Sequence, residues 1–176
     1  MRAARQTGSA RRRHRLRHCP PMIRPAQPDD VPVLLRLTEQ TGLFLPHEID
    51  TLSELLTDYF AGLEQWQHRA HVLQRGNQAG GFVYYAPASL TDRTWYLYWI
   101  VVARELQGQG WGSQLLRFVE DDLRQRGARL LLIETSSRPA YAPTRAFYQK
   151  RGYVPCATVP DFYADGDDLV IFIRRL

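Results

Sequence analysis

The sequence predicts a single α+β domain with a mixed, mostly antiparallel central sheet and helices on both of its faces. The first observation is size: 176 residues, 44% of them hydrophobic and 23% charged, suit one globular domain able to bury a core. The second is the order of the periodic segments, which reads β, α, α, β, β, β, α, β, α, β, β. The third is that this order contains only one strand–helix–strand crossover that suits a parallel pair.

The first half of this domain is expected to place two helices ahead of three strands. A short strand at Met22–Arg24 comes first. Leucines at helical spacing then predict a helix that starts after Asp30 and stops at Gly42, and a second helix from about residue 50 to residue 66. Two strands joined by a turn at Gly76-Asn77 follow, and a nearly uncharged third strand is expected near the centre of the sheet. Their expected ranges are His71–Arg75, Gly81–Ala86 and Trp95–Val102.

The second half contains the expected parallel pair. A helix from about Gly110 to Arg126 carries an apolar stripe and is expected to end at Gly127. The short buried strand Leu130–Ile133 follows, so this helix connects two parallel strands. A short helix and two strands complete the chain, with expected ranges Thr144–Lys150, Tyr153–Val159 and Leu169–Arg174.

The basic charge of the chain lies at its beginning. The net charge is +5, but residues 1–21 hold seven arginines and no acidic residue, so residues 22–176 carry about −2. A domain of that charge lacks the basic surface on which nucleic-acid binding depends. We expect residues 1–21 to be a disordered basic tail. The arginine-rich composition of the whole chain favours an overextended start ahead of Met22, while a transit peptide and a nucleic-acid-binding arm remain as alternatives.

Composition also argues against several classes of protein. The longest apolar run, Trp95–Ala103, is nine residues long, whereas a membrane-spanning helix needs about 20. Two cysteines, Cys19 and Cys156, are too few for a disulfide framework. His14, His18 and Cys19 lack a fourth ligand, so no metal site is expected. These observations favour a cytoplasmic protein.

The most informative segment is the glycine loop, Gln107–Gly112, which lies between an expected strand and an expected helix. Its three glycines let the backbone approach a ligand and leave N–H groups free at the positive end of a helix, a combination that suits an anionic phosphate. A flexible loop that merely starts the helix is the alternative. A P-loop is excluded because it needs a lysine here, and Lys150 is the only lysine in the chain.

A dinucleotide-binding fingerprint is a further interpretation of the same loop. Gly108, Gly110 and Ser113 nearly fit its pattern, and Glu134 stands near the end of the next strand, where a ribose-binding acid would belong. However, residues 103–107 are too many for a tight turn directly after the strand, and the chain offers only one crossover.

Two motifs together resemble the GNAT superfamily of acyl-CoA-dependent N-acyltransferases. The first, Gln/Arg-x-x-Gly-x-Gly/Ala, is matched by Gln107, Gly110 and Gly112. The second, aromatic-Tyr-x-Lys-x-Gly-aromatic, is matched by residues 147–153. The order of expected elements is also that of the family from residue 22 to residue 176. The resemblance therefore covers all but the tail and makes 22–176 an expected N-acetyltransferase domain.

This resemblance implies acetyl-CoA as the acyl donor. Its pyrophosphate would bind backbone N–H groups of the glycine loop. Its pantetheine arm would lie between two parallel strands that splay apart and would pair, like an extra strand, with the backbone near Val101 and Val102. Tyr148 is the family's usual general acid, which protonates the departing thiolate; a core aromatic is the alternative role. The implied donor-binding residues are Val101, Val102, Gln107, Gly108, Gln109, Gly110, Trp111, Gly112 and Ser113.

The sequence also departs from the family pattern. Tyr141 stands where the family often has asparagine, and Thr144 where it has a small residue. No acidic residue lies between Asp92 and Glu105 on the central strand, where family members often place a base. An amine of pKa ~10 must lose a proton before it attacks. Glu134 is the best candidate for that base; a purely structural carboxylate, or a chain of waters to bulk solvent, is the alternative.

The sequence leaves the acceptor open. Four aspartates in residues 160–168 would favour a cationic amine, or they are ordinary solvated turn residues. We expect a bacterial, acetyl-CoA-dependent N-acetyltransferase that acts on a primary amine of a small molecule or peptide by direct attack, as a monomer or a homodimer. A non-catalytic acyl-CoA-binding sensor is the alternative from another class. Aromatic residues that would line an acceptor pocket, or serve as core, are Phe44, Trp66, Trp95, Phe162 and Tyr163.

Overall fold

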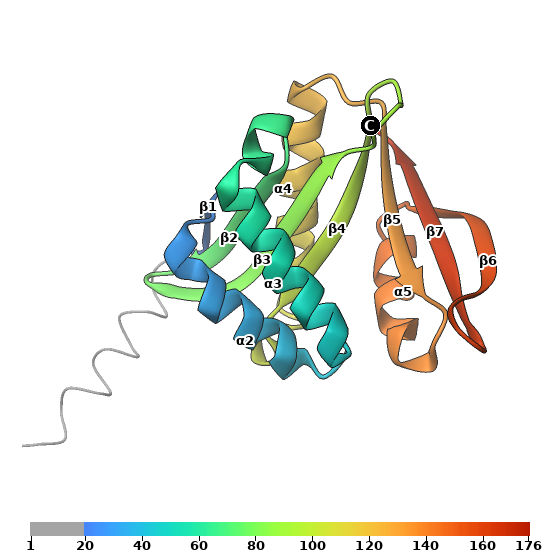
Figure 1. The fold of residues 1–176 in the computed structure, drawn as a ribbon, viewed down its shortest axis with the longest axis horizontal. Helices are drawn as coiled ribbons and strands as arrows, with labels where there is room; N and C mark the ends of the chain where they lie inside the picture. Colours follow the sequence, from blue (N-terminus) through green and yellow to red (C-terminus); the bar gives the residue numbers. More distant parts are fainter. Residues whose placement is uncertain (1–19) are drawn as a thin grey trace, which may run out of the picture.

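Within residues 20–176, seven strands form one sheet in the order β1-β2-β3-β4-β5-β7-β6 (Figure 1). The computed structural model describes residues 20–176, so the expected disorder of the basic tail concerns residues that lie almost wholly outside it. Every neighbouring pair of strands is antiparallel except β4 and β5. The strands are β1 (Met22–Pro25), β2 (Arg69–Arg75), β3 (Gln78–Pro87), β4 (Thr94–Val102), β5 (Leu130–Ser136), β6 (Val154–Ala164) and β7 (Asp167–Arg175).

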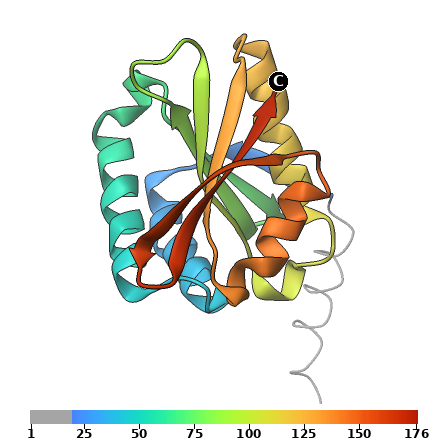
Figure 2. The same ribbon diagram turned by 90° about the vertical axis from the view of Figure 1, so that its right-hand side faces the viewer.

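In the described part of the chain, four α-helices cover the two faces of the sheet, which confirms the expected fold class (Figures 1 and 2). Leucines of α2 and α3 pack with β2 and β3 on one face, whereas α4 and Tyr148 of α5 pack on the opposite face. Strand β3 serves both cores, because successive side chains of a strand alternate between faces: Phe82 and Tyr84 join one core, and Val83 and Tyr85 join the other. The helices are α2 (Val31–Thr41), α3 (Pro46–Ala61), α4 (Trp111–Gln125) and α5 (Ala142–Gln149).

The largest difference from the expected elements concerns α3. This helix begins at Pro46 rather than near residue 50, since proline suits the first helical position and the Glu48 carboxylate accepts the Leu45 N–H at 2.6 Å. It ends at Ala61 rather than Trp66, because Gly62 leaves the helical conformation and only a short 3-10 turn follows. The strand expected at residues 130–133 continues to Ser136, so Glu134 lies within β5.

A β-bulge interrupts β4 at Tyr98. Trp99 pairs with Tyr84 and Leu97 pairs with Tyr85, which leaves Tyr98 without a partner on β3. One extra residue reverses the side-chain alternation beyond it. Accordingly, Leu97 lies in the core beneath α4, whereas Val101 lies in the core beneath α2 and α3.

The parallel pair β4 and β5 opens towards the ends of its strands. Pairing joins Thr94–Leu97 to Leu130–Ile133, but β4 continues to Val102 and β5 to Ser136 without pairing to each other. The two strands therefore diverge, as Figure 1 shows. A single parallel pair also leaves no doubly wound sheet for the dinucleotide-binding alternative. None of the helices within residues 20–176 is long and apolar enough to cross a membrane.

Candidate active site

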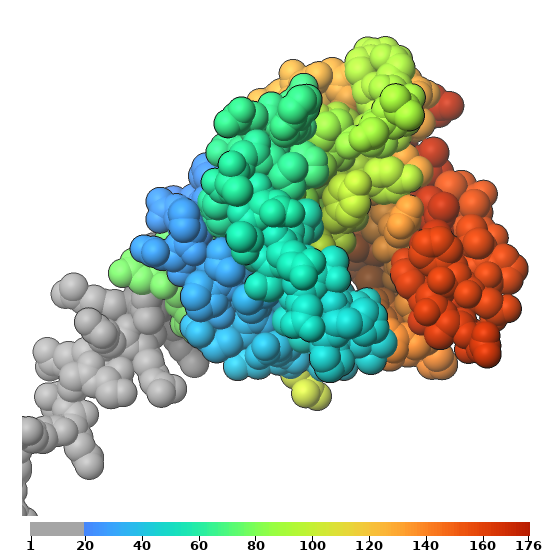
Figure 3. Space-filling model, in the orientation of Figure 1, coloured from blue at the N-terminus to red at the C-terminus, as the bar shows by residue number. Residues whose placement is uncertain are grey.

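A cavity of about 760 Å³ lies where β4 and β5 diverge. Its wall comes from these two strands, the glycine loop, the start of α4, the α2–α3 connection and α5. Figure 3 shows a hollow on this side of the molecule, between α3 and the β6–β7 hairpin. The expected site residues that line the cavity are Val101, Val102, Gln107, Gly108, Gly110, Gly112, Ser113, Glu134 and Tyr148.

Two expected donor-binding residues do not line the cavity with the others. The Trp111 side chain is buried in the core, where the Arg75 guanidinium lies 5.1 Å from its ring centroid. The Gln109 side chain donates to the Glu105 carbonyl at 2.7 Å, and its backbone N–H points to the Leu106 carbonyl at 3.4 Å. Any contribution of Trp111 to ligand binding would therefore come from its backbone.

The glycine loop presents a helix N-terminus to the cavity. Gly110 has φ 86°, a left-handed conformation that turns the chain directly into α4 at little cost for glycine. The N–H groups of Trp111, Gly112 and Ser113 lie in the first helical turn, where no intrahelical carbonyl can accept them. A side chain at Gly112 would bring its Cβ to 3.2 Å from Phe147. This end of the cavity is thus built to bring backbone donors close to an anion.

Two arginines that were not expected from the sequence line the same end of the cavity. The Arg151 guanidinium donates to the Ser113 hydroxyl and to the Phe147 carbonyl, the latter at 2.9 Å. It also lies 3.7 Å from the centroid of the Phe147 ring. Arg104 lies before the loop. Arg151 is inside the second family motif, so a basic residue after Lys150 was the available signal.

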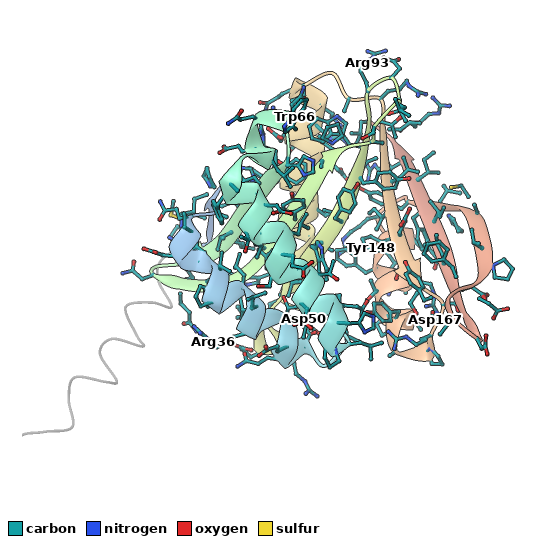
Figure 4. The ribbon with its side chains drawn as sticks, viewed as in Figure 1. Arg36, Asp50, Trp66, Arg93, Tyr148 and Asp167 are labelled. Atoms are coloured by element: carbon teal, nitrogen blue, oxygen red, sulfur yellow. The ribbon has the colours of Figure 1, made fainter. Side chains whose placement is uncertain are left out.

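Tyr148 combines a core ring with a position on the cavity wall. The residue is only 3% exposed, and its ring lies 5.8 Å from the rings of both Tyr153 and Phe172. Figure 4 shows it on α5, facing the space between β4 and β5. Burial raises the pKa of its hydroxyl, so the group remains protonated at neutral pH. The side chain can therefore serve the core and hold a proton at the cavity.

Glu134 lies across the cavity on β5. Its side chain is exposed and lines the wall, and it forms no ion pair with any residue in the described part of the chain. Partial shielding of its carboxyl from solvent raises the pKa, while the neighbouring Tyr96 hydroxyl lowers it, with a net upward shift. A carboxylate with a raised pKa and no cationic partner is suited to accept a proton.

Aromatic rings border the cavity near Glu134. Phe44 packs against Trp99 at 5.0 Å and against Tyr141 at 6.4 Å between ring centroids, and the Tyr141 hydroxyl donates to the Leu43 carbonyl at 3.3 Å. Tyr98 also lines this wall. Of the aromatic residues proposed from the sequence, Phe44 lines the cavity, whereas Trp66, Trp95, Phe162 and Tyr163 do not.

Three of the four aspartates in residues 160–168 form hydrogen bonds within the protein. The Asp167 carboxylate is buried, accepts the Ser136 hydroxyl at 2.5 Å and pairs with Arg138 at 3.1 Å. Asp161 and Asp168 accept backbone N–H groups of the same hairpin. These groups stabilise the turn. Residues 20–176 contain no group of three or more His, Cys, Asp or Glu side chains that could hold a metal; His14, His18 and Cys19 lie outside the described residues.

Comparisons with known proteins agree with this geometry. A sequence model described as the acetyltransferase (GNAT) family matches residues 36–153. A crystal structure from Desulfovibrio desulfuricans, assigned to the GNAT family of acetyltransferases, is 35% identical, with a TM-score of 0.84 over 89% of this chain and 99% of that chain. No curated protein matches the chain.

Two more distant structures share the fold. The ribosomal-protein-S18-alanine N-acetyltransferase of Escherichia coli has 19% identity and a TM-score of 0.70, covering 89% of this chain and 94% of that chain. A Salmonella typhimurium protein, whose structure contains its cofactor acetyl-CoA, has 18% identity and a TM-score of 0.69 over 89% and 94% of the two chains.

Proposed function

Because the chain belongs to the GNAT family of acetyltransferases, we propose that it transfers the acetyl group of acetyl-CoA to the nitrogen of a primary amine. One observation carries this proposal. A single cavity joins a helix N-terminus suited to phosphates, the buried hydroxyl of Tyr148 and the carboxylate of Glu134, which has no ion-pair partner within residues 20–176. These are an anchor for the donor, an acid and a base, the three components that acyl transfer to an amine needs.

The residues present fit acetyl-CoA as the donor. Its phosphates would bind the first-turn N–H groups of α4, supported by Arg104 and Arg151. Its pantetheine arm would lie along β4 near Val101 and Val102, where the strand has no partner on β5. When bound, acetyl-CoA supplies an acetyl group activated as a thioester. Residues 22–176 would then form the catalytic domain.

Two side chains would transfer the protons in this reaction, Glu134 as the base and Tyr148 as the acid. Glu134 would take a proton from the ammonium form of the acceptor, so that the nitrogen lone pair becomes free to attack the thioester carbonyl. As the new C–N bond forms and the C–S bond breaks, Tyr148 would donate its proton to the departing sulfur. Its raised pKa keeps that proton available at neutral pH. After attack the nitrogen still carries one proton more than an amide can keep. This proton passes through solvent to the Tyr148 phenolate, which restores the phenol, and the Glu134 carboxyl group returns its own proton to solvent.

Direct transfer is favoured over an acyl-enzyme. Cys156, the only cysteine within residues 20–176, is exposed on β6 and does not line the cavity. A covalent route would need a nucleophile beside an activating base. Amine and donor would therefore meet in one ternary complex.

The decisive experiment separates binding from turnover. The full chain is titrated calorimetrically with acetyl-CoA and with NADH, and thiol release from acetyl-CoA is then followed with a panel of amines. We expect acetyl-CoA to bind, NADH not to bind, and thiol release to depend on an amine. Binding of acetyl-CoA with no release on any amine would favour the sensor alternative, and failure to bind acetyl-CoA would overturn the proposal.

A further inference from the structure

The cavity has opposite chemical character at its two ends. Its basic lining residues are Arg104 and Arg151, and both belong to the end formed by the glycine loop and α5. Its acidic lining residue within the described chain is Glu134, at the other end. The end that faces away from the phosphates is therefore anionic.

The walls of the anionic end are largely aromatic. The lining residues Phe44, Trp99 and Tyr141 form a packed series of rings, and Tyr98 lies beside Tyr96 with 5.6 Å between ring centroids. Tyr98 is the residue displaced by the β4 bulge, and it is 53% exposed. A half-exposed ring at a cavity wall leaves apolar surface that a ligand can cover.

The other cations near this end are already engaged. Arg138 pairs with Asp167 at 3.1 Å and lies 5.3 Å from the Tyr141 ring centroid. Arg145 donates to the carbonyls of Ser136 and Arg138 at 2.6 and 3.1 Å. Glu134 thus faces the cavity beside tyrosine rings, without a cation of its own in the part of the chain that the structure describes. The Glu134 carboxylate would repel an acidic group on the acceptor.

We propose that the acceptor is a small cationic monoamine that carries an aromatic group and no acidic group. This inference rests on the proposed function, since it assigns the acceptor of the same site. The ammonium would lie between Glu134 and the Tyr98 ring, with an ion pair on one side and a cation–π contact on the other. The aromatic body would pack against Phe44 and Trp99. The same contacts would bring the amine to the carboxylate that removes its proton.

Matched amines test the proposal. Phenethylamine has the cation and the ring; L-phenylalanine adds a carboxylate; n-butylamine lacks the ring; and an alanyl peptide presents a terminal amine on a polar backbone. We expect kcat/KM for phenethylamine to exceed that for L-phenylalanine by about tenfold or more, because a second carboxylate would approach Glu134. We expect kcat/KM for phenethylamine to exceed kcat/KM for n-butylamine by about threefold to tenfold, because only phenethylamine has a ring that contacts the aromatic wall. A peptide or L-phenylalanine that matches or exceeds phenethylamine would overturn the proposal.

Variants at the displaced tyrosine give an independent measure. Tyr98→Ala removes the ring, and Tyr98→Phe keeps it. We expect KM for phenethylamine to rise about fivefold or more in the alanine variant and to change little in the phenylalanine variant, with KM for acetyl-CoA constant in both. Trp66→Ala is the matched control, because Trp66 is 73% exposed and lies far from Tyr148 (Figure 4). If Tyr98→Ala raised the KM of all amines equally, the proposed contact between the Tyr98 ring and an aromatic amine would be contradicted.

Failure of the proposed function can be told apart from failure of this inference. Amine binding to the full chain saturated with CoA is measured by calorimetry, which needs no turnover. Tighter binding of phenethylamine than of L-phenylalanine supports the assigned acceptor even where thiol release is absent. Turnover of other amines without such a preference overturns the acceptor class and leaves the acetyltransferase proposal intact.

Discussion

The two ends of the cavity are built in different ways. The proposed phosphate end comes mainly from one continuous segment, residues 107–113, whose backbone N–H groups would be the principal donors. The proposed acceptor end is assembled from β4, β5, the α2–α3 connection and the turn before α5, and its chemistry would reside in the side chains. A backbone site requires little more than glycines before a helix. A side-chain site can change with any one of the elements that build it.

This difference predicts separable defects. A change at the phosphate end should weaken acetyl-CoA without altering the preference among amines. A change at the acceptor end should alter the preference among amines without weakening the binding of acetyl-CoA. Tyr148 lies at the junction, so its loss should leave both ends able to bind while transfer fails.

The largest effect is expected for Tyr148→Phe. The ring and its packing against Tyr153 and Phe172 remain, but the proton for the departing thiolate is lost. General acids contribute about 100-fold or more, so kcat should fall by about that factor while the Kd for acetyl-CoA stays constant. Stopped-flow thiol release and calorimetry measure the two quantities. An unchanged kcat would leave Tyr148 with a role in the core alone.

Glu134→Gln should have the next largest effect and should change the pH profile. The pKa of Glu134 is raised, so the carboxyl is protonated and inactive as a base on the acid side of that pKa, and kcat/KM should rise as pH increases through it. The nearby Tyr96, Tyr98 and Tyr163 also have raised pKa values and remain neutral in this range. The glutamine variant should lose about tenfold or more in kcat/KM. At low pH, its remaining pH dependence should then reflect only the deprotonation of the acceptor amine.

The same variant has a stability signature of definite sign. Because the folded-state pKa of Glu134 lies above the ordinary value of 4.5, the folded chain binds more protons than the unfolded chain between these two values. Stability should fall as pH rises through this window. Glu134→Gln should remove that fall, and the variant should melt at or above the temperature of the unaltered chain at pH 7. Melting curves at pH 4 and pH 7 test this, and a lower melting temperature at pH 7 would indicate a structural role.

The sequence predicted the part of the site that one continuous segment forms better than the part that several elements assemble. The glycine loop could be proposed as a phosphate site from its glycines and its place before a helix, whereas the family resemblance supplied the role of Tyr148 and the partly separated strands. The displacement of Tyr98 depends on a register shift between β3 and β4, which alternation within one strand cannot reveal. The engagement of Asp167 with Ser136 and Arg138 likewise depends on how β7 lies beside β5. Pairings between distant segments were thus the missing information.

At the phosphate end, Ser113→Asp should weaken donor binding without unfolding the chain. A carboxylate in the first turn of α4 interacts favourably with the helix dipole and can pair with Arg151, so stability should be maintained. The same charge repels phosphates, and the Kd for acetyl-CoA should rise at least tenfold, on the order of 1.4 kcal/mol. Ser113→Ala is the control, with a much smaller rise. An equal effect of both variants would point to the hydroxyl rather than to the charge.

The smallest effect is expected for Tyr141→Phe, at the position where the family often has asparagine. In this chain the Tyr141 hydroxyl donates to the Leu43 carbonyl at 3.3 Å and so connects α5 with the α2–α3 connection. Loss of one such hydrogen bond costs about 0.5–1.5 kcal/mol, which a melting curve can resolve. Because the ring remains against Phe44, the acceptor wall should loosen only slightly, and the KM for an aromatic amine should rise about twofold while the KM for acetyl-CoA does not change. A rise in the KM for acetyl-CoA instead would show that Tyr141 contacts the acyl donor, as the family's asparagine is expected to do. Tyr141 would then belong to the donor-binding end of the cavity rather than to the acceptor end.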